Sequence, residues 1–299
     1  MPLARVGGVR GKLRVDLGRA SGTPANQARP MYWNEPGCLL GQPDTVTHPC
    51  TFGDSAHPTR TVALVGDSIA GNWFPALNVI ARQQHWKLVT ELHGNCVWTA
   101  TMMWYDSTDG PYAACHQWGV NVLHDLLTTV QPDVVITTGN QLEMPVDNPV
   151  SAPSARAETA AGEAAYWRQL EAHGIGVIAL AETPSFPGDL SDCIARNSQD
   201  PRHCAAPRST VLMPDPPTSY AARDMGGTVP LVDMNSFICG PRQCDPVVGN
   251  VRVYLDEHHL TAAYSRTLAP YLKVRLRSAS PALFVLTRAV HRVSTAGAG

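Results

Sequence analysis

The sequence predicts an α/β fold: a three-layer sandwich in which a parallel sheet of about five strands lies between two layers of helices. Two observations support this prediction. Short apolar segments alternate with segments of helical periodicity about four times along the chain. Glycine and polar residues follow several of the apolar segments, where parallel strands would end together at one edge of a sheet.

Five segments are predicted strands. The first, TVALV at residues 61–65, is short, apolar and rich in β-forming residues. KLVTELH at 87–93 and DVVITTGN at 133–140 come next, and the latter ends in a Gly-Asn turn. IGVIALAET at 175–183 and VPLVDMN at 229–235 complete the expected sheet.

Two helices are expected in the first half of the chain. Residues 69–84 carry apolar side chains at helical spacing in their second half, and Pro75 falls in the first turn, where proline is tolerated. Residues 120–131 present one apolar face and stop at Pro132.

Two more helices are expected in the second half. Residues 157–174 are rich in Ala and Glu and end at Gly174, a typical C-terminal cap. Residues 261–276 form the closing helix, and the Thr261 hydroxyl is a suitable N-cap.

These elements predict one domain over residues 31–277. Residues 31–60 and 184–217 inside it are expected to be mostly loop. Residues 1–30 are basic and glycine-rich without periodicity, and residues 278–299 are basic and serine-rich, so we expect a flexible arm and a flexible tail.

The composition narrows the classes of function. The 299 residues are 44% hydrophobic, which is enough for a sizeable core. The formal net charge of −2 gives no reason to expect a nucleic-acid partner. No stretch approaches the roughly 18 apolar residues of a membrane span.

The eight cysteines are even in number and contain no CxxC spacing, which argues against a zinc ribbon or a thioredoxin-type site. We expect four disulfides and therefore an oxidising compartment, with buried free thiols as the alternative. Pairing between sequence neighbours is the simplest arrangement, but the spacing does not decide it. The candidates are Cys38, Cys50, Cys96, Cys115, Cys193, Cys204, Cys239 and Cys244.

The N-terminus conflicts with export. Residues 1–20 are basic but lack the apolar segment of a signal peptide. We therefore expect either that the chain is a fragment or that its start is wrongly assigned, and that the domain works outside the cytoplasm.

Three residue positions stand where the first three strands end: Ser68, Gly94 and Asn140. A serine nucleophile needs a base, and the charge that develops on the substrate oxygen needs N–H donors. The hydroxyl and the donors would meet if these strands are neighbours. The alternatives are an N-cap role for Ser68, a simple turn at Gly94 and an Asx turn at Asn140.

The stretch YLDEHHLT at 254–261 offers a base. Two residues separate Asp256 from His259, a spacing that lets the carboxylate reach the imidazole Nδ1 and leaves Nε2 for the serine. His258 is the competing base, and a capping or core role is the other alternative. A metal site here is disfavoured because consecutive side chains point in different directions.

VALVGDSIAGNWFPAL, followed late in the chain by YLDEHHLT, resembles the SGNH (GDSL-like) hydrolase superfamily. The chain is most similar to the SGNH domain fused to the acyltransferase type 3 membrane domain in bacterial O-acyltransferases. The resemblance covers roughly residues 36–272. Asp67 is expected to hold the GDS turn through backbone N–H groups.

The resemblance implies a flavodoxin-like α/β/α sandwich and a Ser68–His259–Asp256 triad. It implies an oxyanion hole from the Ser68 N–H, the Gly94 N–H and Asn140. The activity expected is transfer or hydrolysis of O-acyl groups, typically acetyl, on cell-surface carbohydrate, without a metal or organic cofactor. The partners expected are an acyl donor, a carbohydrate acceptor and a membrane acyltransferase domain that is on another chain or lost.

One motif departs from the family. The third conserved block of the superfamily is usually Gly-x-Asn-Asp, whereas this chain has TTGNQ, in which Asn140 directly follows Gly139. Two other functions remain open: a secreted esterase of small esters, and a non-catalytic glycan-binding domain that keeps the fold.

Overall fold

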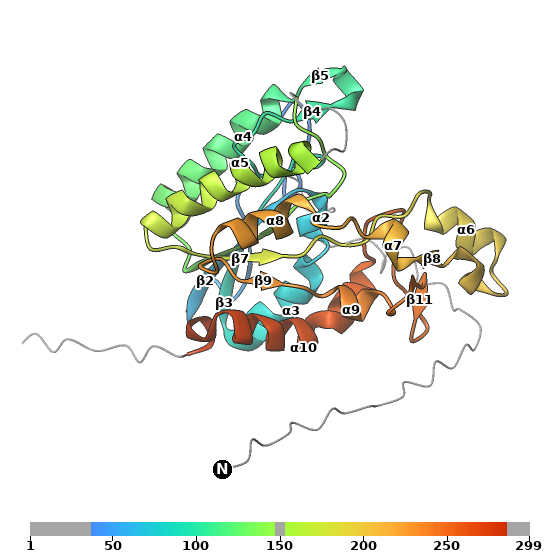
Figure 1. Ribbon diagram of the computed structural model, residues 1–299. Helices are drawn as coiled ribbons and strands as arrows, with labels where there is room; N and C mark the ends of the chain where they lie inside the picture. Colours follow the sequence, from blue (N-terminus) through green and yellow to red (C-terminus); the bar gives the residue numbers. More distant parts are fainter. Residues whose placement is uncertain (1–36, 147–152, 286–299) are drawn as a thin grey trace, which may run out of the picture.

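The computed structural model describes residues 37–146 and 153–285. The expected arm at 1–30 and the end of the expected tail lie outside these residues. The described chain forms a three-layer α/β/α sandwich with a mostly parallel central sheet, as predicted (Figure 1).

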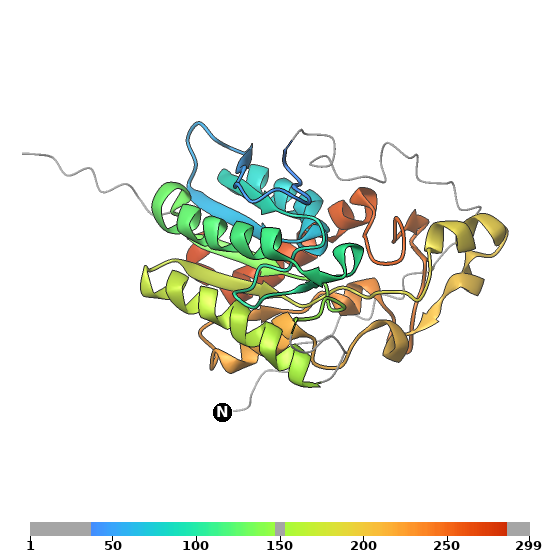
Figure 2. The ribbon, with the colours of Figure 1, turned by 90° about the horizontal axis from the view of Figure 1, so that it is seen from above.

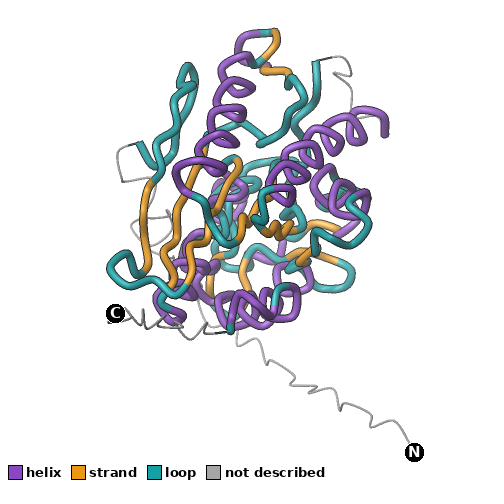
Figure 3. The backbone as a smooth tube through the Cα atoms, turned by 90° about the vertical axis from the view of Figure 1, so that its left-hand side faces the viewer, coloured by secondary structure: helices purple, strands orange, loops and turns teal. Residues whose placement is uncertain are grey.

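The sheet has six strands in the order β1-β3-β2-β6-β7-β9. Five of them run parallel and correspond to the predicted strands. Figure 3 shows strands of the sheet side by side, with helices around them. They are β2 (Arg60–Gly66), β3 (Trp86–Leu92), β6 (Val134–Thr138), β7 (Gly176–Leu180) and β9 (Leu231–Val232). Because β2 lies between β3 and β6, the first three predicted strands are neighbours, and their carboxyl ends meet at one edge.

The sixth strand, β1 (Cys50–Gly53), was not expected. It pairs antiparallel with β3 at the edge of the sheet, inside the segment predicted to be loop. This strand has only four residues and is surrounded by prolines and turn residues, so the sequence shows no strand pattern there.

Helices α3 (Phe74–Gln84) and α10 (Ala262–Ala279) pack on one face of the sheet. Their apolar side chains meet those that β2 turns to that face, Val62 and Leu64. Ala63 and Val65 point to the opposite face, as the alternation of a strand requires.

The opposite face is covered by α4 (Ala113–Asp125), α5 (Pro153–Ala172) and α8 (Pro217–Asp224) (Figures 1 and 2). A π-helical turn at Leu126–Val130 continues α4. Helix α4 begins seven positions before the predicted start, because the turns between 113 and 119 carry no regular apolar pattern.

The segment predicted to be loop at 184–217 contains short elements and projects to one side of the sandwich (Figure 1). They are α6 (Leu190–Arg196), a 3-10 turn at Pro201–Cys204, β8 (Ala206–Pro207) and α7 (Arg208–Val211). The other short elements are β4 (Trp104–Tyr105), a 3-10 turn at Asp106–Thr108, β5 (Gly110–Pro111), α9 (Asn235–Ile238), β10 (Gln243–Cys244), β11 (Val247–Val248) and β12 (Val251–Arg252).

The predicted domain boundary at 277 falls inside α10, which continues to Ala279. A 3-10 turn at Pro281–Phe284 follows and buries Leu283 in the core. The structure of the domain therefore continues beyond the predicted start of the tail, because Leu283 and Phe284 add apolar surface to the α3–α10 face.

All eight cysteines form disulfides, each with its neighbour in the sequence. The pairs are Cys38–Cys50, Cys96–Cys115, Cys193–Cys204 and Cys239–Cys244. The predicted disulfides and their simplest pairing are both present, so no thiol is free among these residues.

Candidate active site

The turn that follows β2 requires a glycine and begins the short helix α2 (Ser68–Gly71). Gly66 has φ of 143°, and a Cβ atom there would lie 2.4 Å from the Thr138 carbonyl oxygen on β6. The close approach of β6 therefore excludes any side chain at this position. Ser68 becomes the first helical residue and stays partly exposed at the sheet edge.

Asp67 stabilises this turn. Its Oδ1 accepts hydrogen bonds from the backbone N–H groups of Ile69 at 2.7 Å and Ala70 at 3.2 Å, as an N-cap does. Its Oδ2 accepts the Asn140 N–H at 2.6 Å, which joins the ends of β2 and β6. Burial raises the pKa of Asp67 to about 6, although these three N–H donors lower it. The carboxyl group thus has the structural role that was expected for it.

The turn that carries the two histidines is built around Asp256. Its Oδ1 accepts the backbone N–H groups of His258 at 3.0 Å and His259 at 2.8 Å. Its Oδ2 lies 2.7 Å from Nδ1 of His259. Burial alone raises the pKa of Asp256, but the hydrogen bonds and the charge of His259 outweigh it and lower the pKa to about 2. The carboxylate is therefore ionised wherever the protein is folded under ordinary conditions.

Ser68, His259 and Asp256 meet in one line of hydrogen bonds. Nε2 of His259 lies 2.8 Å from Oγ of Ser68, across 191 positions of the chain. Because Nδ1 donates to the carboxylate, Nε2 carries the lone pair and faces the hydroxyl. The structure thus brings together the three residues that the sequence singled out, in the geometry in which a serine hydroxyl can be deprotonated.

Asn72 links the two halves of this arrangement, and the sequence analysis did not identify it. It is buried directly after α2. Its Oδ1 accepts the Leu260 N–H at 2.9 Å, and its Nδ2 donates to the His258 carbonyl at 3.2 Å. One amide therefore holds the backbone on both sides of His259. Its position four residues after Ser68 was the available signal, because a polar side chain on a buried helix turn needs a partner.

Asn140 lies beside this arrangement in an Asx turn, in which its Oδ1 accepts the Leu142 N–H at 3.0 Å. The bond orients the amide, and no acceptor among the described residues is bonded to its Nδ2. The same holds for the backbone N–H of Ser68. Both groups remain available as donors to a ligand.

The prediction for Gly94 is wrong in this structure. Its N–H donates to the Leu40 carbonyl oxygen at 2.8 Å, so it is not free to stabilise an oxyanion. The neighbouring Asn95 has a left-handed backbone with φ of 54°, is exposed, and lines the same cavity as Asn140. The Leu40 carbonyl, in the segment before β1, thus accepts the Gly94 N–H that was expected to be free.

Residues 37–273 match the sequence family described as the SGNH domain fused to AT3 domains. This chain belongs to that SGNH domain family. Membership supports an enzyme that acts on ester bonds, by acyl transfer or by hydrolysis. A comparison with curated proteins found no significant match.

Two solved structures are similar to this SGNH domain at low sequence identity. A lipopolysaccharide acetyltransferase periplasmic domain from Salmonella ser. Paratyphi A has a TM-score of 0.56 and 15% identity, over 73% of this chain and 83% of that chain. A GDSL-like lipase from Bacteroides thetaiotaomicron has a TM-score of 0.41 and 12% identity, over 74% of this chain and 89% of that chain. No helix within residues 37–146 and 153–285 is long and apolar enough to cross a membrane.

A cavity of about 400 Å³ borders the SGNH site. It is lined by Asn140, Asn95, Glu143 and the partly exposed aromatic rings of Trp104 and Tyr105. Three other tryptophans are buried in the core, at 0 to 1% exposure: Trp73, Trp98 and Trp118. Trp104, by contrast, can be reached by a ligand.

The histidine turn of this SGNH domain also groups possible metal ligands. Ligand atoms of Asp256, His258 and His259 lie within 4.8 Å of one another. Nδ1 and Nε2 of His259 already contact Asp256 and Ser68, which leaves this ring no nitrogen for a cation while those contacts persist. The contacts therefore favour acid–base chemistry over metal binding here.

Proposed function

We propose that this protein is a serine-dependent O-acyltransferase or esterase, in which Ser68 is the nucleophile. The observation that carries this proposal is the continuous line of hydrogen bonds from Asp256 through His259 to Ser68. Family membership supports the reaction class, and the geometry supports the assignment of roles.

The reaction begins when Oγ of Ser68 attacks the carbonyl carbon of an acyl ester and Nε2 of His259 takes the hydroxyl proton. Asp256 stabilises the imidazolium that forms. Collapse of the tetrahedral intermediate breaks the ester C–O bond, and the departing alcohol takes the proton from His259. The acyl group is then held as an ester of Ser68 until water or a sugar hydroxyl, deprotonated by His259, attacks it.

The negative charge on the substrate oxygen needs donors beside Ser68. The Ser68 N–H and Nδ2 of Asn140 are the groups we assign, because neither is bonded to an acceptor in the described chain. Asp67 joins the two, since it binds the N–H of Asn140 and caps the helix that begins with Ser68. Asn95, the residue after Gly94, lines the same cavity as Asn140 and adds a further polar group there.

We further propose that the acceptor is a carbohydrate. The cavity next to Asn140 presents Trp104 and Tyr105, whose flat faces suit the C–H surface of a sugar ring, together with polar groups that suit its hydroxyls. The Salmonella domain is by its name a lipopolysaccharide acetyltransferase domain, which agrees with an acetyl group and a glycan.

Work outside the cytoplasm is part of the same proposal. Four disulfides are stable in an oxidising space, and the Salmonella structure is of a periplasmic domain. The family description names fusion to AT3 domains, so a membrane acyltransferase is the partner that would deliver the acyl group.

Burst kinetics with p-nitrophenyl acetate test the enzyme proposal. A rapid release of p-nitrophenol, equal to one equivalent of protein, is expected from the wild type and not from Ser68→Ala. Equal bursts from both proteins would remove Ser68 from the mechanism. If the wild type gives no burst and hydrolyses no ester, a glycan-binding domain is favoured.

The partition of the acyl group separates the transferase from a small-ester esterase. In the presence of oligosaccharides, a transferase forms acetylated sugar at the expense of free acetate. Unchanged acetate production at high concentrations of every sugar would identify a hydrolase instead.

A further inference from the structure

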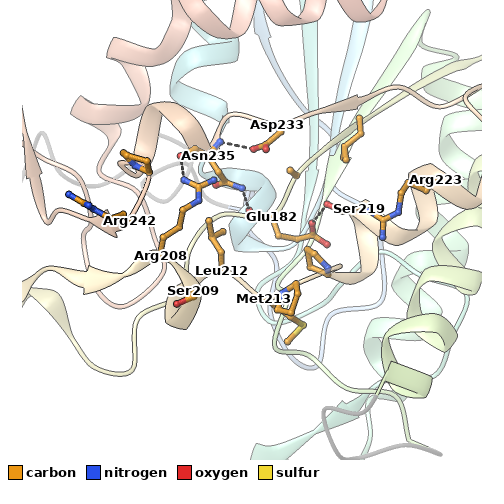
Figure 4. A pocket seen from close by; sticks show the side chains of 15 residues that line it. Glu182, Arg208, Ser209, Leu212, Met213, Ser219, Arg223, Asp233, Asn235 and Arg242 are labelled. Atoms are coloured by element: carbon orange, nitrogen blue, oxygen red, sulfur yellow. Dashed lines mark hydrogen bonds between the residues drawn. The ribbon is translucent and has the colours of Figure 1, made fainter. Parts of the chain in front are cut away.

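A second cavity, of about 730 Å³, lies at the carboxyl edge of the same sheet, where β7 and β9 end (Figure 4). None of Ser68, His259 and Asp256 lines it. Figure 4 shows Arg208 and Arg242 on one side and Glu182, Ser219 and Arg223 on the other. The function proposed above makes no use of this cavity.

Two arginines, Arg208 and Arg242, come from neighbouring positions of paired backbone segments. Strands β8 and β10 pair antiparallel, and next to them the Arg208 N–H donates to the Arg242 carbonyl oxygen at 2.9 Å. The disulfide Cys239–Cys244 closes the loop that carries Arg242. Both guanidinium groups are therefore attached to a backbone that is fixed before any ligand arrives, which lowers the entropic cost of binding.

The charge of this arginine pair is not neutralised by an acid. Nη1 of Arg208, which is partly buried, donates to the carbonyl oxygens of Asn235 at 3.2 Å and Gly240 at 3.5 Å. Among the described residues, no carboxylate lies within 4.0 Å of the Arg208 or Arg242 guanidinium. Arg223, across the cavity, is paired with Asp215 and contributes little net charge.

The acidic groups of the cavity are bound elsewhere. The Glu182 carboxylate accepts the Thr218 N–H at 2.6 Å and the Ser219 hydroxyl at 2.8 Å, so it faces α8 and not the arginine pair. Burial raises its pKa to about 7, which weakens its negative charge near neutral pH. Asp233 accepts the Asn235 N–H at 2.7 Å. The unpaired positive charge of the cavity therefore lies with Arg208 and Arg242.

We propose that this cavity binds an acidic sugar, with the carboxylate or phosphate group on Arg208 and Arg242. Guanidinium groups bind both anions through two parallel hydrogen bonds, and the remaining N–H donors of Arg208 suit this contact. The volume is that of a small-molecule site. The apolar side chains of Leu212 and Met213 line the wall and give the ring a surface to pack on.

The position of the cavity suggests what the site is for. Met213 N–H donates to Oε1 of Gln141, the residue next to Asn140, so one loop separates the cavity from the candidate oxyanion donors. An oligosaccharide that extends from Ser68 along the strand ends would place an acidic residue here. This use rests on the proposed function, but binding itself does not.

Calorimetric titration of the wild-type protein with glucuronate, glucose 1-phosphate, glucose and inorganic phosphate tests the proposal. Glucuronate or glucose 1-phosphate is expected to bind at least tenfold more tightly than glucose, and glucose 1-phosphate more tightly than inorganic phosphate. Affinity should fall with added salt. No binding by either acidic sugar, or equal binding of glucose, would overturn the proposal. Inorganic phosphate as tight as the sugar phosphate would overturn recognition of the sugar.

Two variants locate the site. Arg242→Gln and Arg208→Gln are each expected to weaken binding about tenfold or more, and Arg242, which is exposed, can be replaced without a cost to folding. The matched control is Arg202→Gln, an exposed arginine of the same projecting segment that is paired with Asp200. Wild-type affinity in folded Arg242→Gln, or an equal loss in the control, would contradict the assignment.

Ser68→Ala separates this proposal from the previous one. It should bind the acidic sugar as the wild type does, even if it performs no acyl chemistry. A loss of binding in that variant would mean that the sugar occupies the Ser68 site, which would contradict the second site.

Discussion

Replacement of Asn72 by alanine should reduce catalysis far more than its distance from the reacting atoms suggests. The side chain of Asn72 touches no substrate, but it binds the backbone on both sides of His259, at the Leu260 N–H and the His258 carbonyl. It is therefore a positioning residue for the base. Without it, the turn that presents the imidazole loses its bonds to the helix that presents Ser68.

The magnitude follows from the lost hydrogen bonds to the Leu260 N–H and the His258 carbonyl. Each leaves a polar group without its partner, at a cost of about 1–3 kcal/mol, so we expect the free energy of unfolding to fall by about 2–6 kcal/mol. We expect the loss in kcat to exceed what the lower stability of the fold alone would cause. A shift of about 1 Å in the imidazole is enough to reduce kcat by roughly 100-fold.

The assay combines urea unfolding with steady-state hydrolysis of p-nitrophenyl acetate, at a temperature where the variant is fully folded. The expected result is a lower kcat with little change in KM, since Asn72 contacts the base and not the ester. Asn72→Asp is the informative second variant. It keeps an acceptor for the Leu260 N–H but places a carboxylate oxygen against the His258 carbonyl, so it should recover part of the stability and little of the rate.

Asn78→Ala is the matched control. Asn78 lies on the adjacent helix α3, and its buried Oδ1 has no partner in the described chain, so its removal should leave kcat unchanged. A folded Asn72→Ala protein with the wild-type kcat, or a loss equal to that of Asn78→Ala, would refute the positioning role.

Three further predictions concern the fold. Glu91 is buried; burial, and next the charge of Asp125, raises its pKa from 4.5 to about 8, although a backbone N–H of His48 lowers it. Since the folded pKa lies above the unfolded one, the contribution of Glu91 to stability is greatest below about pH 4.5 and falls by a few kcal/mol as pH rises to about 8. Glu91→Gln should flatten this dependence in urea midpoints; an unchanged slope would refute the assignment. Gly66→Ala should prevent folding, because the added Cβ would meet the Thr138 carbonyl oxygen. Gly174 has φ of 78° but no atom within 4 Å of an added Cβ, so Gly174→Ala should lower the melting temperature only slightly. Equal melting temperatures of the two variants would contradict the steric argument. Replacing Cys96 and Cys115 together by serine removes a disulfide of separation 19 and should cost about 3 kcal/mol in chemical unfolding; no loss would show that the pair constrains nothing.

The parallel sheet and the grouping of Ser68, His259 and Asp256 could be predicted from the sequence because both leave strong local patterns. Five apolar segments of β-forming residues stand out against amphipathic helices, and their polar ends share one edge. The spacing of Asp256 and His259 also encodes a local turn, which the structure closes with the Asp256 carboxylate on two backbone N–H groups.

Contacts between distant segments could not be predicted in this way. The Gly94 N–H was expected to be a donor because Gly94 follows a predicted strand at the sheet edge, but its acceptor is the Leu40 carbonyl, more than fifty positions away. The edge strand β1 and the role of Asn72 depend on the same kind of pairing. Such contacts are set by which strands become neighbours, and short irregular segments carry no periodic signal of it.

The arginine pair was hidden for a related reason. Arg208 and Arg242 lie in segments without regular structure in the sequence pattern, and the pairing of β8 with β10 brings them together. Only the fold shows that one cavity collects them and that no acid of the described residues neutralises them.

The central claim is that Ser68 carries the acyl group, and mass spectrometry of the protein after rapid mixing with an acetyl ester tests it most directly. An acid quench during the burst stops the reaction before the second step removes the acyl group from the enzyme. We predict that the intact mass rises by one acetyl group, that peptide mapping assigns it to Ser68, and that Ser68→Ala does not acquire it. Acetylation elsewhere, or turnover of the ester by Ser68→Ala, would contradict the account.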